Sequence, residues 1–372
     1  MRLLIVSVST GAGHVRAGEA LLKSAERDFP ELKASHIDMM DYVNVAVKKT
    51  LLESYELMAT QLPELWRFVY KKTDRPQTSW IVRSGSKLLN RGAAGRFLEY
   101  VASLEPDQIL CTHFLPAHAL LEAPAKYRLS MPVSILMTDY DKHDLLTTPG
   151  LHNYFVATEK MRWKMQASGI PSESITVSGI PVDPVFYQTK DLSALRSQYQ
   201  IPGDKTVILI LSGGQGLAKL DAIVTTLFTS TQSIHVIAIA GSNQKLRDKL
   251  GALRPPAHIT FTHVGWTDQI DEYMRLADVI ITKPGGLSAT ECMALSKPMI
   301  LISPIPGQEE HNAEYILEHG FGVIAHAPDD LLYYVEKELS ALMARREVKK
   351  SLVNATGVIL EKIIMGNEEI RK

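Results

Sequence analysis

Short apolar runs alternate with helix-like segments along almost the whole chain, and this alternation limits the fold more than any other feature. Each run, such as Leu3–Val8 or Val207–Leu211, is bounded by turn residues, which is typical of a buried strand. Because helical segments separate most of the runs, we expect parallel sheets joined by crossover helices, and therefore an α/β protein. The other predicted strands are Gln108–Cys111, Val133–Met137, Tyr154–Ala157, His235–Ala240, Ile259–Phe261, Val279–Thr282, Met299–Ile302 and Val323–Ala325.

The chain is long enough for two domains. Its 372 residues can form two separate cores, and turn residues gather between Pro181 and Lys205. We place the domain boundary there and expect two Rossmann-like, doubly wound domains, residues 1–190 and 191–350, that face a cleft. Ligands of such domains bind at the carboxyl ends of the strands, so this is where candidate site residues are expected.

The composition excludes several classes of protein. The formal net charge is −1, so no overall positive field indicates a nucleic-acid partner. The two cysteines, Cys111 and Cys292, lie in a strand-like and a helix-like run and are expected to be buried, which fits a reducing cytoplasm better than a disulfide framework. No cysteine–histidine spacing indicates a zinc site. No apolar stretch approaches the ~20 residues that span a bilayer.

Two glycine-rich turns in the second half of the chain each follow a predicted strand. The first is Ser212–Gly216 and the second is Lys283–Gly286, which opens into a helix-like segment. Glycine lets a ligand approach the backbone, and a helix N-terminus offers free N–H groups and a positive dipole end. Two such turns favour a pyrophosphate site, although a plain turn is the alternative for each of them.

Polar residues that suit a nucleotide sugar follow these turns. Glu291 can accept hydrogen bonds from both hydroxyls of a ribose, but an exposed helical glutamate is an equally simple interpretation. Gln308, Glu309 and Asn312 follow the proline-rich loop that begins at Pro304, and their side chains are of the kinds that bind sugar hydroxyls. The alternative for this segment is an ordinary loop with an acidic helix start.

The end of the first strand carries a candidate general base. The turn Gly11-Ala12-Gly13 leads into a helix predicted over Val15–Arg27, and His14 stands at its start. The helix dipole lowers the pKa of a histidine there, which keeps it neutral and able to accept a proton. Asp139, just after the strand Val133–Met137, could orient His14 or hold an acceptor hydroxyl. A structural histidine and a capping aspartate are the alternatives.

Residues 43–101 depart from the α/β rhythm. They carry ten lysines and arginines against five acids, an excess of five positive charges, with aromatic side chains between them. Aromatic and basic side chains together favour the surface of an anionic membrane. The alternative is a pair of solvated helices whose aromatic side chains face the core. The candidate membrane and acceptor residues are Trp66, Lys71, Lys72, Arg75 and Trp80.

Taken together, these motifs resemble those of the diacylglycerol glycosyltransferases, the monogalactosyl- and glucosyl-diacylglycerol synthases related to the lipid II N-acetylglucosaminyltransferase. The resemblance covers nearly the whole chain in the same order. It implies a GT-B fold, an inverting hexosyltransferase, no catalytic metal and no cofactor apart from activation by anionic lipid. The motifs that carry it are Gly11–His14, Thr138-Asp139, Ser178–Val182, Ser212–Gly214, Lys283–Gly286 with Glu291, and Pro306–Glu309 with Asn312.

The resemblance also implies roles for individual residues. The second domain would bind UDP-glucose or UDP-galactose, and the first would bind diacylglycerol, with His14 as the base and residues 43–101 docking peripherally on the cytoplasmic face of the membrane. The helix in residues 351–372 would pack back on the first domain. The implied donor residues are Ser212, Gly213, Gly214, Gly285, Gly286 and Ser288 at the pyrophosphate, Glu291 at the ribose, Val264 at the uracil, and Gln308, Glu309 and Asn312 at the hexose.

Three rival functions remain open at this stage. A polyprenyl-linked saccharide would also suit an acceptor site near a basic, aromatic surface. A soluble UDP-sugar 2-epimerase would share the fold but would not need the membrane-docking stretch. A catalytically silent UDP-sugar sensor would not need His14 or Asp139.

Overall fold

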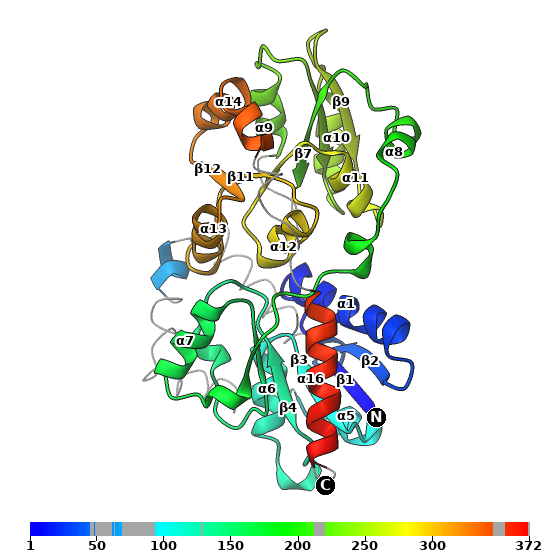
Figure 1. Cartoon of the computed structure of the whole chain (residues 1–372), viewed down its shortest axis with the longest axis vertical. Helices are drawn as coiled ribbons and strands as arrows, with labels where there is room; N and C mark the ends of the chain where they lie inside the picture. The colour runs from blue at the N-terminus through cyan, green and yellow to red at the C-terminus, as the bar shows by residue number, and fades with distance from the viewer. Residues whose placement is uncertain are drawn as a thin grey trace. The chain divides into compact units, whose positions relative to one another are not determined.

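The computed structural model describes residues 1–44, 48, 62, 64–68, 94–127, 129–211, 220–344 and 354–370. The chain divides into two compact units (Figure 1). Unit 1 comprises Met1–Pro184, Ile305–His311 and Val353–Lys372, and unit 2 comprises Val185–Pro304 and Asn312–Leu352.

Unit 1 is built on a six-stranded, entirely parallel sheet in the order β2-β1-β3-β4-β5-β6. Its strands are β1 (Arg2–Ser7), β2 (Lys33–Asp38), β3 (Gln108–Cys111), β4 (Val133–Leu136), β5 (Tyr154–Val156) and β6 (Ile175–Val177). Its α-helices are α1 (Ala12–Asp28), α5 (Gly95–Leu104), α6 (Phe114–Leu121), α7 (Glu159–Ala167) and α16 (Ala355–Ile370). Short 3₁₀ helices lie at Met39–Asp41, Ala125–Tyr127, Asp144–Leu146 and Ser172–Ser174, and a further one, Pro184–Tyr187, begins at the last residue of the segment Met1–Pro184 and continues into unit 2.

The strands of unit 1 are buried on both faces, as expected for a parallel sheet. Leu4 and Val6 of β1 belong to a core cluster that includes Phe97 of α5, whereas the alternate residues Leu3 and Ile5 are buried on the opposite face. Helix α1 packs near β1 and β2, and α16 packs on α1. A hydrogen bond of 3.0 Å from Ser24 to Thr356 and one of 3.1 Å from the Gln108 side chain to the Ile363 carbonyl fix α16 in place.

Unit 2 has a second six-stranded parallel sheet, in the order β12-β11-β10-β7-β8-β9. Its strands are β7 (Thr206–Leu211), β8 (Ile234–Ile239), β9 (Thr260–Val264), β10 (Val279–Thr282), β11 (Met299–Ile302) and β12 (Gly322–Ala325). Its α-helices are α8 (Leu192–Gln198), α9 (Leu220–Leu227), α10 (Gln244–Ala252), α11 (Ile270–Leu276), α12 (Gly286–Ala294), α13 (Gln308–Glu318), α14 (Pro328–Glu336) and α15 (Leu339–Ala344), the first turn of α13 being part of unit 1.

The predicted α/β class with two Rossmann-like sheets is confirmed, and each predicted strand overlaps an observed one. Two strands were missed, β2 and β6. Strand β2 is an edge strand of sequence Lys-Ala-Ser-His-Ile-Asp whose residues are exposed or half-buried, so it has no apolar run to mark it. Strand β6 is an edge strand of three residues. The two cysteines are buried and free, as predicted.

Two predicted boundaries were wrong. Helix α1 begins at Ala12, so Ala12 and Gly13 are helical and Gly11 alone caps the helix in an extended conformation. The predicted surface insertion 43–101 extends too far towards its C-terminal end, because Phe97, Leu98 and Val101 of α5 are completely buried in the core of unit 1. Most of that stretch lies outside the described residues.

Gly322 occupies a place where no side chain fits. It pairs with Met299 across β11 and β12, and a Cβ atom at Gly322 would lie 2.5 Å from the Met299 carbonyl oxygen. We expect Gly322→Ala to lower the free energy of unfolding by about 1–3 kcal/mol, because a backbone atom must move to admit the methyl group. Thermal or urea unfolding measures this. Gly203→Ala is the control, since nothing lies within 4 Å of its Cβ position. Equal stability of the two variants would contradict the prediction.

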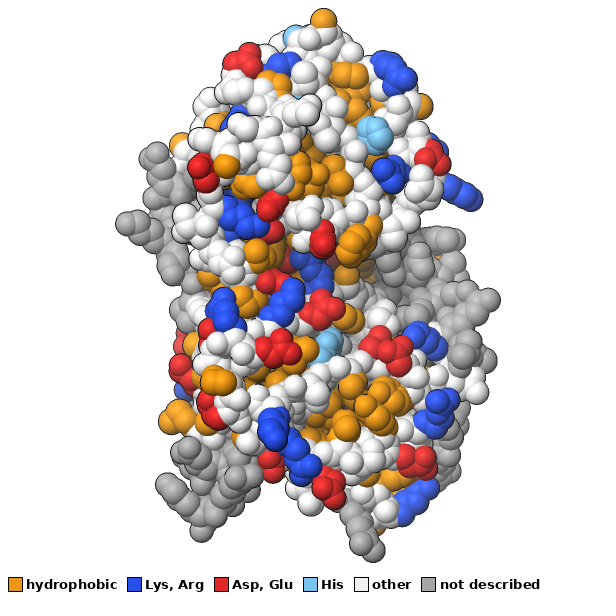
Figure 2. Space-filling model, turned by 90° about the vertical axis from the view of Figure 1, so that its right-hand side faces the viewer, with side chains coloured by type: hydrophobic (Ala, Val, Ile, Leu, Met, Phe, Trp, Pro, Cys, Tyr) orange, Lys and Arg blue, Asp and Glu red, His pale blue; other side chains and the backbone are white. Residues whose placement is uncertain are grey.

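In the part of the chain that the structure describes, no helix combines the length and apolar character needed to cross a membrane. Figure 2 shows acidic and basic side chains interspersed over one face of the molecule, with hydrophobic side chains exposed between them. This mixture agrees with the net charge of −1 and gives that face no field of a single sign.

Candidate active site

His14 is the third residue of α1 and is held by the ends of two neighbouring strands. Its Nδ1 lies 2.7 Å from the carbonyl oxygen of Thr112, which follows β3, and 3.1 Å from Oγ1 of Thr138, which lies beyond the end of β4. A carbonyl oxygen can only accept a hydrogen bond, so Nδ1 must carry the proton. Nε2 therefore has a lone pair and can accept a proton from a substrate.

The surroundings of His14 also set its charge. Burial lowers its pKa from the ordinary value, whereas the negative charge of Asp139 and the hydrogen bond to the Thr112 carbonyl oppose this by raising it. Because the net shift is downward, the imidazole is neutral near pH 7, as a general base requires. The structure thus brings the two predicted catalytic residues, His14 and Asp139, close enough for their charges to interact.

A hydrogen-bond network holds the backbone of His14 in place. The Ser7 hydroxyl donates to the His14 backbone carbonyl at 3.1 Å and receives a hydrogen bond of 3.0 Å from the Thr112 hydroxyl. It also lies 2.7 Å from Nε2 of His36 on β2. Gly18 of α1 makes room for this contact, because a Cβ there would lie 2.5 Å from the same His36 nitrogen. The network connects α1 with β1, β2 and the end of β3.

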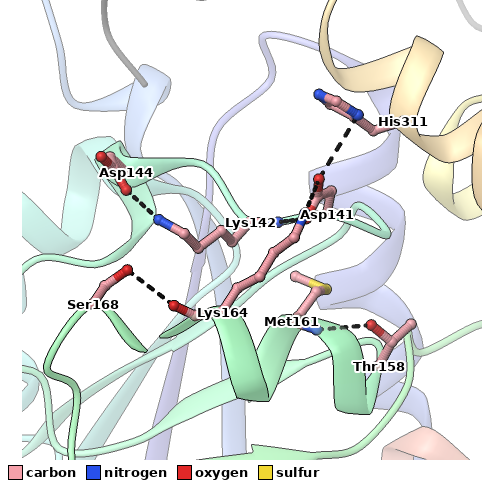
Figure 3. Close-up of polar contacts among 8 residues, drawn as sticks. All are labelled: Asp141, Lys142, Asp144, Thr158, Met161, Lys164, Ser168 and His311. Atoms are coloured by element: carbon pink, nitrogen blue, oxygen red, sulfur yellow. Dashed lines mark hydrogen bonds and ion pairs between the residues drawn. The ribbon is translucent and has the colours of Figure 1, made fainter. Parts of the chain in front are cut away.

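The other acids after β4 are held in ion pairs. The Lys164 ammonium of α7 lies 2.6 and 2.7 Å from the two carboxylate oxygens of Asp141, and Nδ1 of His311 lies 3.7 Å from the same carboxylate (Figure 3). Lys142 is paired with Asp144. Of Asp139, Asp141 and Asp144, Asp139 is the one whose charge raises the pKa of His14.

A change at Asp139 should be visible in the pH profile. The Asp139 carboxylate favours the imidazolium form of His14, so Asp139→Asn removes a negative charge that raises the His14 pKa. Activity that needs neutral His14 falls as the pH drops through that pKa, and we expect the acidic limb of the kcat/KM profile to move to lower pH in the variant. A limb that stays in place, or moves to higher pH, would contradict this.

In unit 2, the N-terminus of α12 has the features of an anion site. Gly285 caps the helix with φ −68° and ψ 137°, no side chain caps it, and no acid lies in the first turn, which contains Gly286 and Ser288. The first N–H groups of a helix have no partner within it. Nothing lies within 4 Å of the Cβ position of Gly285, so a ligand can approach this backbone.

Glu291 lies one turn further along α12 and is 2% exposed. The interpretation of Glu291 as an exposed helical glutamate was therefore wrong. Val264 ends β9, and its carbonyl oxygen accepts a hydrogen bond of 2.8 Å from the Ala240 amide. The roles at the ribose and the uracil that the resemblance implies for these two residues stay predictions.

The loop before α13 is held by two acids in the first turn of that helix. A carboxylate oxygen of Glu309 accepts a hydrogen bond of 2.7 Å from the Ile305 amide, and one of Glu310 accepts one of 2.9 Å from the Gly307 amide. Asn312 is completely buried. These contacts also agree with the alternative of a loop with an acidic helix start. The hexose-binding roles of Gln308, Glu309 and Asn312 stay predictions.

The membrane candidates are described only in part. Trp66 is half-buried in a short helical stretch, 64–68, where Leu65 and Phe68 are exposed and Arg67 donates a hydrogen bond of 2.9 Å to Glu310. The remaining candidates lie outside the described residues: Lys71, Lys72, Arg75 and Trp80, together with Ser212, Gly213 and Gly214 of the donor site.

Sequence reasoning missed His113. It directly follows Thr112 at the end of β3, and its ring lies edge-on to that of His14 with 4.7 Å between ring centres. Its Nδ1 accepts a hydrogen bond of 3.1 Å from the Leu115 amide and so caps α6. The strand-end rule that selected His14 and Asp139 applies equally to the end of β3, so this signal was available in the sequence.

Two family models and several curated proteins match this chain. Residues 14–182 match the family model of monogalactosyldiacylglycerol (MGDG) synthase, and residues 207–360 match that of the glycosyltransferase family 28 C-terminal domain. A processive diacylglycerol beta-glucosyltransferase of Bacillus subtilis is 26% identical over 99% of this chain and 96% of its own length. One of Bacillus mycoides is 28% identical over 98% and 94%.

The chain thus resembles the diacylglycerol glycosyltransferases over almost its whole length. The MGDG synthase match begins at His14 and the family 28 match contains α12, so both groups described above lie within matched regions. Acinetobacter baumannii MurG superposes with a TM-score of 0.63 at 15% identity, covering 98% of this chain and 99% of its own. Staphylococcus aureus MnaA, solved with UDP, gives 0.60 at 16% identity, covering 100% and 98%.

These structures confirm the GT-B fold that the resemblance implied. The glycosyltransferase family 28 C-terminal domain, together with the match to curated glycosyltransferases, identifies the chain as a hexosyltransferase. The choice between a transferase and an epimerase or a sensor, which the sequence motifs had left open, is thereby decided in favour of the transferase.

Proposed function

We propose that this protein transfers glucose from UDP-glucose to the hydroxyl of diacylglycerol, with inversion and without a metal ion. The observation that carries the proposal is the fixed tautomer of His14, which leaves an unprotonated Nε2 at the end of a parallel sheet. The names of the curated relatives, processive diacylglycerol beta-glucosyltransferases, support glucose rather than galactose and diacylglycerol rather than a polyprenyl-linked saccharide.

The chemistry is a single displacement. The glycerol oxygen of the lipid forms a bond to the anomeric carbon of glucose while the bond from that carbon to the UDP oxygen breaks, and the hydroxyl proton passes to Nε2 of His14. Attack on the face opposite to the leaving group inverts the anomeric centre. The negative charge that develops on UDP is stabilised by the backbone N–H groups and positive dipole end of α12, which is why we propose no metal.

The lipid side of the proposal depends on residues 43–101. Leu62, Leu65 and Phe68 are between 45% and 61% exposed, although large apolar side chains usually avoid water. We propose that this stretch docks on an anionic membrane surface at the cytoplasmic face, and that anionic lipid activates the enzyme.

Release of UDP tests the function. The protein is incubated with UDP-glucose or UDP-galactose, with and without diacylglycerol, in anionic mixed micelles. Release that needs both UDP-glucose and diacylglycerol is expected, and it should persist in EDTA. The anomeric configuration of the product by NMR checks the inversion. Release with UDP-galactose instead would change the donor, and release only with a polyprenyl-linked saccharide would overturn the acceptor.

A further inference from the structure

His113 and His14 are neighbouring histidines whose backbone partners force opposite tautomers. The Leu115 amide can only donate, so Nδ1 of His113 must be unprotonated, and in the neutral ring the proton is on Nε2. The Thr112 carbonyl can only accept, so His14 carries its proton on Nδ1 and has its lone pair on Nε2. Among the described residues, one ring therefore has an acceptor nitrogen without a partner, and the other has an N–H donor without one.

Both rings are held in these states. Burial, assisted by the nearby His14 and His118, keeps the pKa of His113 well below its ordinary value, so the ring stays neutral. Protonation would also place a proton on Nδ1 and break the cap of α6. Stacking on Phe114, with 4.4 Å between ring centres, fixes the ring further. Within the described part of the chain, the hydrogen bonds of His113 use Nδ1 alone, and the residue is 8% exposed.

This pairing matches the polar groups of a diacylglycerol. Its hydroxyl must give up a proton, which suits Nε2 of His14. The ester on the adjacent glycerol carbon has a carbonyl oxygen that can only accept, which suits an N–H donor. The ring centres are 4.7 Å apart, so a single diacylglycerol can reach both rings, its hydroxyl at His14 and its neighbouring ester at His113.

We propose that His113 determines acceptor specificity, its Nε2–H donating a hydrogen bond to an ester carbonyl of diacylglycerol while His14 accepts the proton of the hydroxyl. This assignment rests on the function proposed above. It predicts that the enzyme distinguishes an ester-linked lipid from an ether-linked one, in which a methylene group replaces the carbonyl, although both present the same hydroxyl and similar chains.

The test compares two acceptors and two proteins. Wild type and His113→Ser are assayed with 1,2-diacylglycerol and with 1,2-dialkylglycerol at equal mole fraction in mixed micelles. Serine is a good helix N-cap, so this variant retains the cap of α6 while it loses the imidazole ring and with it the Nε2–H donor. We expect wild type to prefer the diacyl lipid roughly tenfold in kcat/KM, which corresponds to one hydrogen bond, and we expect His113→Ser to lose this preference.

Each result has a definite meaning. The proposal is supported if His113→Ser lowers kcat/KM for the diacyl lipid about tenfold and leaves the dialkyl lipid and UDP binding unchanged. An equal loss with both lipids would show that His113 is merely structural, and the absence of any preference in wild type would show that no carbonyl is recognised. Both outcomes leave the proposed function standing. If wild type glucosylates neither lipid, the function and this inference fail together.

Discussion

Replacing His14 by alanine should abolish glucose transfer to diacylglycerol and leave UDP binding nearly unchanged. The loss removes Nε2, the proton acceptor, and general-base catalysis contributes about 10²- to 10⁴-fold to rates. UDP binding should persist because the proposed donor residues around α12 belong to unit 2. Product formation from UDP-glucose measures the first effect, and calorimetric titration with UDP measures the second.

The control for this experiment is His152→Ala. His152 is an exposed histidine of unit 1 outside the proposed site, so its removal should leave transfer and thermal stability near wild-type values. His14→Ala also loses the contact of the imidazole with Thr112, so its unfolding temperature must be measured alongside. A folded His14→Ala variant that turns over at the wild-type rate would remove His14 from the role of base.

Gly285→Asp should abolish UDP binding without harming the fold. Its φ and ψ suit an ordinary residue and its Cβ position is open, while aspartate is among the best N-caps and interacts favourably with the helix dipole. The same carboxylate would repel a pyrophosphate at this helix end. Two unit charges 4 Å apart repel by about 4 kcal/mol at an effective dielectric constant of 20, so UDP should bind at least about 100-fold more weakly.

Gly285→Asn provides the matched control for charge. Asparagine has the shape of aspartate and caps helices equally well, but it carries no charge. We expect both variants to unfold at or above the wild-type temperature, with UDP binding lost mainly in the aspartate variant. If asparagine weakens binding as much as aspartate, the cause is steric. If neither variant weakens binding, the pyrophosphate does not lie at α12.

The sequence was sufficient for most of the architecture because a parallel sheet needs strands that are apolar on both faces. Strands such as β7 and β10 are almost completely buried and read as continuous apolar runs. The edge strand β2 could not be found in this way, because a strand that is covered incompletely keeps polar residues such as Lys33 and His36. Its place in the sheet depends on its pairing with β1, and a search for apolar runs does not detect such a pairing.

The sequence predicted where the site residues lie, but not their protonation states or their contacts. His14 and Asp139 were found because they follow strands. The proton on Nδ1 of His14 depends on the Thr112 carbonyl, 98 residues further along the chain, and no local pattern reports such a contact. No local pattern reports the contacts of the Asp141 carboxylate with Lys164 and His311 either, and these contacts distinguish Asp141 from Asp139.

The helix α16 has a consequence for the order of events during synthesis. Ile359, Leu360 and Ile363 complete the core of unit 1, yet they follow every residue of unit 2 in the chain. Roughly 170 residues separate Pro184 from Ala355, which takes about 10 to 30 s at about 5–20 residues per second. For that time the nascent first unit has an uncovered apolar face, which α16 covers only when it emerges last.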